Sequence, residues 1–142
     1  MMNVRRNNKT RAQSLVEMAI TLPAFLLLIL GFIDLGRAVY YYSALGNSVR
    51  EGARYASVQR ALDTTDATTQ DNIIDVVTHY SVSVPISAGD VVADRVDVDG
   101  NLAADGLYVR VSGSVDFDPV IPFLNPITMS SETTMLLAPY AR

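Results

Sequence analysis

An uninterrupted apolar segment near the N-terminus constrains this chain more than any other feature. Residues 15–33, LVEMAITLPAFLLLILGFI, are apolar apart from Glu17 and Thr21. A helix of this length is roughly 28 Å long, close to the hydrocarbon thickness of a bilayer, about 30 Å. The segment therefore predicts a helix that crosses a membrane once.

The distribution of charge predicts how that helix is oriented. The first eleven residues contain four basic side chains and no acidic one, whereas the rest of the chain contains 7 basic and 15 acidic residues. The positive-inside rule then places the N-terminus in the cytoplasm and the C-terminal part outside it, with the chain in the cytoplasmic (inner) membrane. The acidic body argues against nucleic-acid binding, which needs a basic surface.

A cleaved secretory signal peptide is the alternative interpretation of the same segment. The apolar run is longer than the 7–15 residues usual for such a signal. No small-residue cleavage site follows at once, since Asp34-Leu35-Gly36-Arg37 comes next. A stable anchor is therefore the favoured interpretation.

The helix is expected to continue beyond the membrane, from about Ser14 to Gln59, over roughly 70 Å. Pro23 interrupts one backbone hydrogen bond within it, either as a tolerated kink or as a functional flexible point. Beyond the apolar segment, apolar residues recur at steps of three and four, which predicts one stripe that contacts this chain's own domain or a neighbouring chain. The stripe consists of Leu35, Val39, Tyr42, Leu45, Val49, Ala53 and Ala56.

The C-terminal part is predicted to be a small α+β domain. A short helix is expected at about residues 70–80, capped by Thr68 or Thr69. Alternation with period two predicts three antiparallel strands, and three prolines between the last two strands predict a loop at residues 118–126. The strands are expected at residues 91–98, 107–117 and 127–137.

The complete fold prediction is an α+β chain, with a long N-terminal helix, a short second helix and an antiparallel meander of about three strands. We expect three parts. Residues 1–12 form a basic cytoplasmic leader, residues 13–60 form the helix whose first half is transmembrane, and residues 61–142 form the extracytoplasmic domain.

Composition excludes several kinds of chemistry. The chain has no cysteine, and its one histidine, His79, argues against a histidine-based metal site or a catalytic triad. Asp94, Asp97 and Asp99 resemble a calcium loop, but no glutamate follows at the EF-hand spacing, so a turn at a strand end is favoured. We therefore expect a non-enzymatic protein with no cofactor and no metal.

Glu17 is the most informative single residue, because it lies at the start of the apolar segment. An acidic side chain at the centre of a membrane helix costs about 2.5–3.5 kcal/mol, and less near the edge. Taken alone, Glu17 can be an edge residue whose side chain reaches water, or it can have a specific partner.

Three motifs show a resemblance to a known family. They are RAQSLVEM with AITLP at residues 11–23, IDLGRA at residues 33–38, and VREGARYA at residues 49–56. Together they cover about residues 10–57 and resemble the TadE-like family of minor pseudopilins in tight-adherence (Flp-type) systems, which are related to type IV pili.

The resemblance implies processing and assembly. A prepilin peptidase would cut between Ala12 and Gln13, and Glu17 would then pair with the new N-terminal ammonium of Gln13 on an adjacent subunit. Such a pair is strongly attractive at low dielectric, where either charge alone is costly. The family usually has Gly where this chain has Ala12, and an aromatic residue where it has Met18.

The same resemblance makes five further residues candidates for subunit assembly. Without it, Asp34 and Arg37 are a local ion pair three residues apart, and the other three are a solvated helix face. The five residues are Asp34, Arg37, Arg50, Glu51 and Arg54. The implied partners are the lipid bilayer, a prepilin peptidase, other pilin or pseudopilin subunits, and an inner-membrane assembly platform.

The leading functional hypothesis is thus a minor pilin-like subunit that takes part in assembly of a tight-adherence filament at the cell surface. Two alternatives stay open. One is a scaffold of the assembly machinery that never leaves the membrane, and the other is an anchored extracytoplasmic binding module, for example for a surface carbohydrate.

Overall fold

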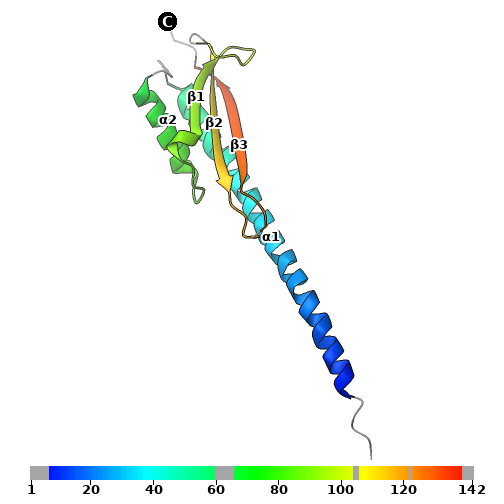
Figure 1. Ribbon diagram of the computed structural model, residues 1–142. Coiled ribbons are helices and arrows are strands. Elements are labelled where there is room, and N and C mark those ends of the chain that lie inside the picture. Colours follow the sequence, from blue (N-terminus) through cyan, green and yellow to red (C-terminus); the bar gives the residue numbers. More distant parts are fainter. Residues whose placement is uncertain (1–6, 60–65, 104–105, 122, 139–142) are drawn as a thin grey trace, which may run out of the picture. The chain divides into compact units, whose positions relative to one another are not determined.

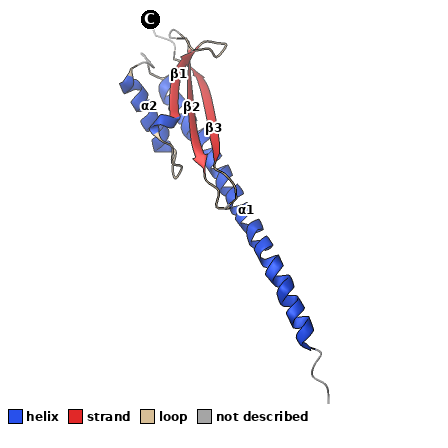
Figure 2. Ribbon diagram, viewed as in Figure 1, coloured by secondary structure: helices blue, strands red, loops and turns tan. Residues whose placement is uncertain are grey.

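The computed structural model describes residues 7–59, 66–103, 106–121 and 123–138, and the side chains of residues 7–11 lie outside the description. Helices α1 (Asn7–Ser57) and α2 (Ala67–Tyr80) precede a short 3₁₀ turn, η2 (Ala88–Asp90), and strands β1 (Val91–Val96), β2 (Tyr108–Phe117) and β3 (Ile127–Leu136) (Figures 1 and 2). The predicted α+β class is confirmed, with its long first helix, short second helix and three strands.

The chain divides into two compact units. The first, here called the anchor unit, combines Met1–Arg37 with Pro119–Leu124, and the second, the sheet unit, combines Ala38–Asp118 with Asn125–Arg142. A short piece of the loop between β2 and β3 therefore belongs with the N-terminal half of α1, although residues 38–118 separate the two in the sequence.

Helix α1 begins earlier than the sequence predicts. It starts at Asn7, so it includes six residues assigned to the leader, and it ends at Ser57, two residues before the expected end. It runs through Pro23, whose ring nitrogen has no hydrogen to donate, so the carbonyl of Ala19 loses its usual helical donor. In the described part of the chain, α1 is the one helix long and apolar enough to cross a membrane.

The apolar side chains of α1 are exposed along the predicted membrane segment. Phe25, Leu28 and Phe32 are more than half exposed, and no protein surface covers the most apolar window of the helix within the described residues. Burying a side chain of this size removes about 1.5–3 kcal/mol of unfavourable hydration. Such a surface is stable only where lipid or another apolar surface replaces water.

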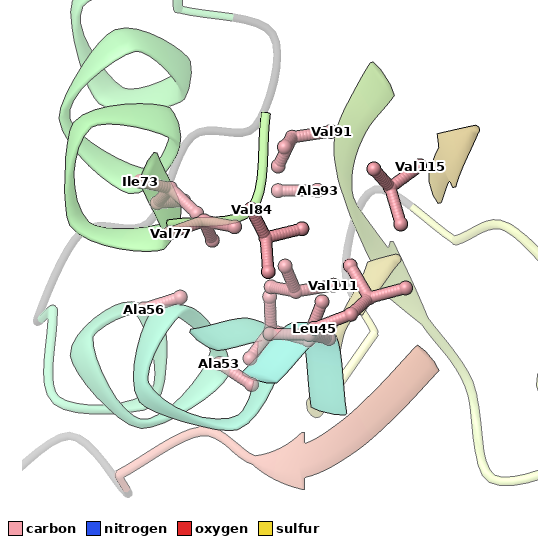
Figure 3. Packing of buried hydrophobic residues seen from close by; sticks show 12 residues of the cluster. Leu45, Ala53, Ala56, Ile73, Val77, Val84, Val91, Ala93, Val111 and Val115 are labelled. Carbon is pink, nitrogen blue, oxygen red and sulfur yellow. The ribbon is translucent and has the colours of Figure 1, made fainter. Parts of the chain in front are cut away.

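The core of the sheet unit lies between the C-terminal half of α1, α2 and the inner face of the sheet (Figure 3). On α1 the core residues are Leu45, Val49, Ala53 and Ala56, all fully buried. They pack with side chains from the other elements, namely Ile73, Val77, Val84, Val91, Ala93, Val109, Val111 and Val115.

The first part of the predicted stripe does not pack against the described residues of this chain's own domain. Leu35, Val39 and Tyr42 are about 60% exposed, whereas Tyr41 is partly buried and meets Phe117 edge-on at 5.5 Å between ring centres. Steps of three and four are both compatible with a helix, and the covered face at this level contains residue 41 rather than 42. The apolar pattern alone does not distinguish these two faces.

The sheet is an antiparallel meander in the order β1-β2-β3. Val91 pairs with Gly113, and Val111 pairs with Thr133, so the apolar face predicted for β2 lies on the core. Each strand begins and ends within two residues of its predicted bounds. The loop predicted after β2 is also confirmed, with Pro122 outside the described residues.

The acid-rich segment after β1 is a turn. The Asp97 carboxylate accepts hydrogen bonds from the backbone N–H groups of Asp99 and Asn101, both at 2.9 Å, and Gly100 adopts φ 82°. The bond from Asn101 is the main cause that holds the pKa of Asp97 below its ordinary value. No group of three metal-ligating side chains occurs among the described residues, so the structure gives no support to the calcium-loop alternative.

Helix α2 starts three residues before the predicted start, and its cap was misassigned. Asp66, rather than Thr68 or Thr69, is the N-cap, and its carboxylate accepts the Thr69 backbone N–H at 3.1 Å. An aspartate one turn ahead of an apolar face is a strong capping residue. Ile73 and Val77, four residues apart on one face of α2, are buried in the core.

Gly52 lets α2 approach α1 closely. A Cβ atom at this position would overlap Cγ2 of Val77, and it would also contact Val111 and Ile73 at 3.6 and 3.8 Å. Gly52, the glycine of the VREGARYA motif, therefore has a packing role in this chain, because a larger residue would push the two helices apart.

We predict that Gly52→Ala destabilises the protein although alanine favours helix formation. The gain in helix propensity is about 1 kcal/mol, whereas overpacking a tight core costs about 1–3 kcal/mol. The expected net loss, on the order of 1 kcal/mol, is measurable as the free energy of unfolding of the full chain in detergent, followed by near-UV circular dichroism.

Gly46→Ala is the matched control, because its new Cβ would lie 3.7 Å from Ser131 Oγ, an ordinary contact. Val77→Ala removes the atom that the new Cβ would overlap, so the losses from Val77→Ala and Gly52→Ala should be less than additive in the double variant. If Gly52→Ala is as stable as Gly46→Ala, the close approach is not a packing constraint.

Candidate functional site

The sequence-predicted site residues lie at three levels along α1. The first group, near the start of α1, is Ala12, Gln13 and Glu17. The second group, directly after the apolar segment, is Asp34 and Arg37. The third group, in the VREGARYA motif, is Arg50, Glu51 and Arg54. Because a helix rises about 1.5 Å per residue, Glu17 and Asp34 are about 25 Å apart along α1. They do not form one site.

The bond between Ala12 and Gln13 is helical in this structure. Both residues are exposed, and they lie in the second turn of the described helix. A peptidase that binds an extended chain would have to unwind these first turns, and terminal turns open at low free-energy cost. The bond is thus accessible at the surface of the described chain.

Glu17 is exposed on the same part of α1. Its backbone carbonyl accepts a hydrogen bond from Thr21 Oγ1 at 2.8 Å. None of the side chains that the structure describes pairs with its carboxylate. A carboxylate beside an apolar helix surface is stabilised by a cation, so Glu17 has the chemistry to bind one from outside the described residues.

Asp34, by contrast, has three hydrogen-bond donors. Its Oδ1 accepts from Arg37 Nη1 and from the Val120 backbone N–H, each at 3.0 Å, and its Oδ2 accepts from the Ile121 backbone N–H, also at 3.0 Å. The side chain is buried, with 5% of the residue exposed. The predicted Asp34–Arg37 ion pair is confirmed, and we call the whole arrangement the Asp34 clamp.

The clamp fixes a loop that has few backbone donors of its own. Pro119 has no N–H, and the next two N–H groups both point to one carboxylate. The loop also lies close to the helix one turn earlier, because a Cβ on Gly31 would be 3.9 Å from Ile121 Cδ1. Hydrogen bonds to a charged group contribute about 1.5–3 kcal/mol each, more than neutral ones.

Sequence reasoning missed the loop side of this clamp. Residues 34 and 120 are 86 positions apart, and backbone N–H groups carry no sequence signature. The available signal was indirect, namely an aspartate directly after an apolar segment and a distant proline-rich loop. Neither observation identifies the other without the tertiary structure.

The third group is a solvated helix face. Arg54 Nε lies 3.8 Å from Glu51 Oε2, and the Arg54 side chain is 74% exposed. Arg50 is also exposed. Such an ion pair contributes at most about 1 kcal/mol to stability, so these charges are available for contacts with other molecules.

A shallow hollow of about 260 Å³ lies beside this face. Tyr80 at its edge is 53% exposed, and the neighbouring His79 is also exposed. The hollow is lined by Glu51, Arg54, Tyr55, Val58, Val76 and Tyr80.

We predict that Asp34→Ala releases the loop. The change leaves two backbone N–H groups without their acceptor, at a cost of about 1–3 kcal/mol. Hydrogen exchange of the peptide containing Val120 and Ile121 should therefore become roughly 10- to 100-fold faster. Arg37→Ala, which removes only the ion-pair partner, should have a much smaller effect. Equal exchange in the wild type and Asp34→Ala would show that the carboxylate does not hold the loop.

Comparison with known families assigns the N-terminal part of this chain. The family model described as TadE-like protein matches residues 12–54. No curated protein and no solved structure matches the chain. The matched range begins at Ala12, the residue before the predicted cleavage point, and it includes Glu17, Asp34 and Gly52. Residues 12–54 are thus a TadE-like segment, in agreement with the family that their motifs resemble.

Proposed function

We propose that this protein is a non-enzymatic minor pilin-like subunit, or pseudopilin, that takes part in assembly of a tight-adherence filament. One observation carries the proposal. Within a TadE-like segment, Glu17 is exposed on α1 five positions after Ala12, where the apolar surface begins, and no described side chain pairs with its carboxylate. TadE-like proteins are associated with Tad pili, and the proposal assigns this chain a specific place among them.

Membrane anchoring is the first step of the proposed mechanism. The exposed apolar surface of α1 supports a single-pass membrane protein. The basic residues before it favour a cytoplasmic N-terminus, so the sheet unit would lie outside the cytoplasm. Lipid covers α1 before assembly, and the apolar surfaces of neighbouring subunits would cover it in a filament.

Processing by a prepilin peptidase is the second step. Cleavage between Ala12 and Gln13 removes the basic leader and creates an ammonium group at Gln13. Glu17 is then one helical turn from its own N-terminus, so the two charges can pair within one chain or between neighbours. Only the intermolecular pair links subunits and sets their axial register, since either charge alone is costly in an apolar surrounding.

The remaining charges of α1 would act later in assembly. Arg50, Glu51 and Arg54 are accessible on one face of the helix and support contacts with neighbouring subunits or with the assembly platform. The carboxylate of Asp34 is already satisfied within the chain, together with Arg37. We therefore propose that these two residues act on assembly through the loop they hold.

Intact-mass analysis of protein extracted from membranes tests the processing step. We expect the mature chain to begin at Gln13. Ala12→Leu should block cleavage because a large residue does not fit a site built for a small one, whereas Ala12→Gly should be processed at least as well as the wild type. A filament fraction in which the chain still begins at Met1 or Met2 would contradict this step.

Glu17→Gln tests the pairing step, because it removes the charge and keeps the size of the side chain. We expect normal amounts of processed protein in the membrane and a severalfold loss from sheared filaments. Glu132→Gln is the matched control, because it makes the same chemical change at an exposed position on β3. If the Glu17→Gln variant were as abundant in sheared filaments as the wild type, the intermolecular pair would be excluded as the basis of docking.

The same fractionation separates the alternative functions. A stable scaffold would be found in the membrane fraction only, even for the wild type. A carbohydrate-binding module has weaker support, since the hollow beside Arg54 has one aromatic ring, Tyr80, that is more than half exposed.

A further inference from the structure

The tip of the loop between β2 and β3 exposes an apolar surface. Residues 119–124, here called the apolar loop, contain no charged side chain. Phe123 is 73% exposed, and Val120 and Leu124 are each 52% exposed. Exposed phenylalanine and leucine side chains in a short loop indicate an interaction surface.

The position of the apolar loop beside α1 indicates that lipid surrounds it. The loop belongs to the same compact unit as the first half of α1. The Asp34 clamp and the contact with Gly31 hold it beside residues 31–34, which end the predicted membrane segment. The helix at this level exposes Phe32 and Ile33. Lipid that covers Phe32 and Ile33 would also surround the apolar side chains of the loop, because the loop is held beside the same turn of α1.

The backbone of the apolar loop is suited to an environment with little water. An irregular segment usually has unpaired N–H groups, which are costly in lipid. Here Pro119 and Pro122 have no N–H, and Asp34 accepts the next two. The Leu124 N–H donates to the Ile121 carbonyl at 3.2 Å. Five of the six residues therefore have no N–H in need of water.

The charge of Asp34 is also compensated. A carboxylate at the edge of a bilayer is costly when unpaired, but this one has a guanidinium and two amide donors within the same unit. The clamp thus satisfies the buried charge and the loop amides with the same three hydrogen bonds.

We propose that the apolar loop is a second membrane contact, which inserts Phe123 and Leu124 into the interfacial region of the bilayer beside α1. The inference rests on the membrane anchoring in the proposed function and not on the role in a filament. A helix with a single apolar segment can slide or tilt in a bilayer, whereas a second contact beside it fixes the depth at which α1 leaves the membrane.

Single-cysteine labelling of the full chain tests this contact, because the chain has no native cysteine. Phe123→Cys and Thr134→Cys are each labelled with an environment-sensitive nitrobenzoxadiazole fluorophore and reconstituted in phosphatidylcholine vesicles at low protein density. Thr134 is the control, as an exposed polar position on β3. Compared with the label at position 134, we expect the label at position 123 to emit at shorter wavelength and to be quenched severalfold less by iodide. Lipids that carry a nitroxide near the headgroup should quench it strongly.

Asp34→Ala in the Phe123→Cys background checks that the clamp positions the loop. Iodide quenching at position 123 should then rise toward the value at position 134. A smaller label at position 124 repeats the measurement with Phe123 intact, so that the result does not depend on the fluorophore at position 123.

Two outcomes would overturn the inference. Iodide quenching at position 123 equal to that at position 134 would place the loop in water. Protection that disappears as the vesicles are diluted with lipid would show that another copy of the chain covers the loop. Vesicle flotation tests anchoring separately, and the result does not depend on whether the chain enters filaments.

Discussion

The carboxylate of Asp34 is the interaction on which the organisation of the anchor unit depends. It lies where the apolar surface of α1 ends, and it holds a loop from the C-terminal third of the chain through two backbone amides. Removing it would leave a guanidinium without its acidic partner and two amides without an acceptor. The aspartate and arginine of the IDLGRA motif therefore have a defined structural role in this chain, separate from any contact with other subunits.

Helix α1 has two different surroundings along its length. Its first half exposes large apolar side chains that only lipid or other subunits can cover, whereas its second half buries small residues, Gly52, Ala53 and Ala56, against α2 and the sheet. Large side chains maximise apolar area toward lipid, and small ones permit close approach of packed elements. One helix can therefore serve as a membrane anchor and as a central element of a domain core.

Sequence reasoning succeeded where the physical signal is local and periodic. Alternation identified β1, β2 and β3 to within two residues, and the length of the apolar segment identified the helix that is long and apolar enough to cross a membrane. Sequence reasoning failed where two neighbouring residues could take the same cap or the same buried position at similar free energy. Asp66 caps α2 instead of the threonines that follow it, and Tyr41 is covered instead of Tyr42. The candidate site residues of the TadE-like segment were proposed from motif spacing, which gives their identity and not their contacts.

The sequence by itself determined which part of this protein is apolar enough to cross a membrane and which part is polar, because hydrophobicity and charge are properties of single residues and add along the chain. It also determined the strands and the candidate residues Ala12, Gln13 and Glu17. Only the tertiary structure decided which distant groups meet: Asp34 with the amides of the apolar loop, and Gly52 with Val77. Such contacts depend on the register of all the elements between them, and no local pattern records that register.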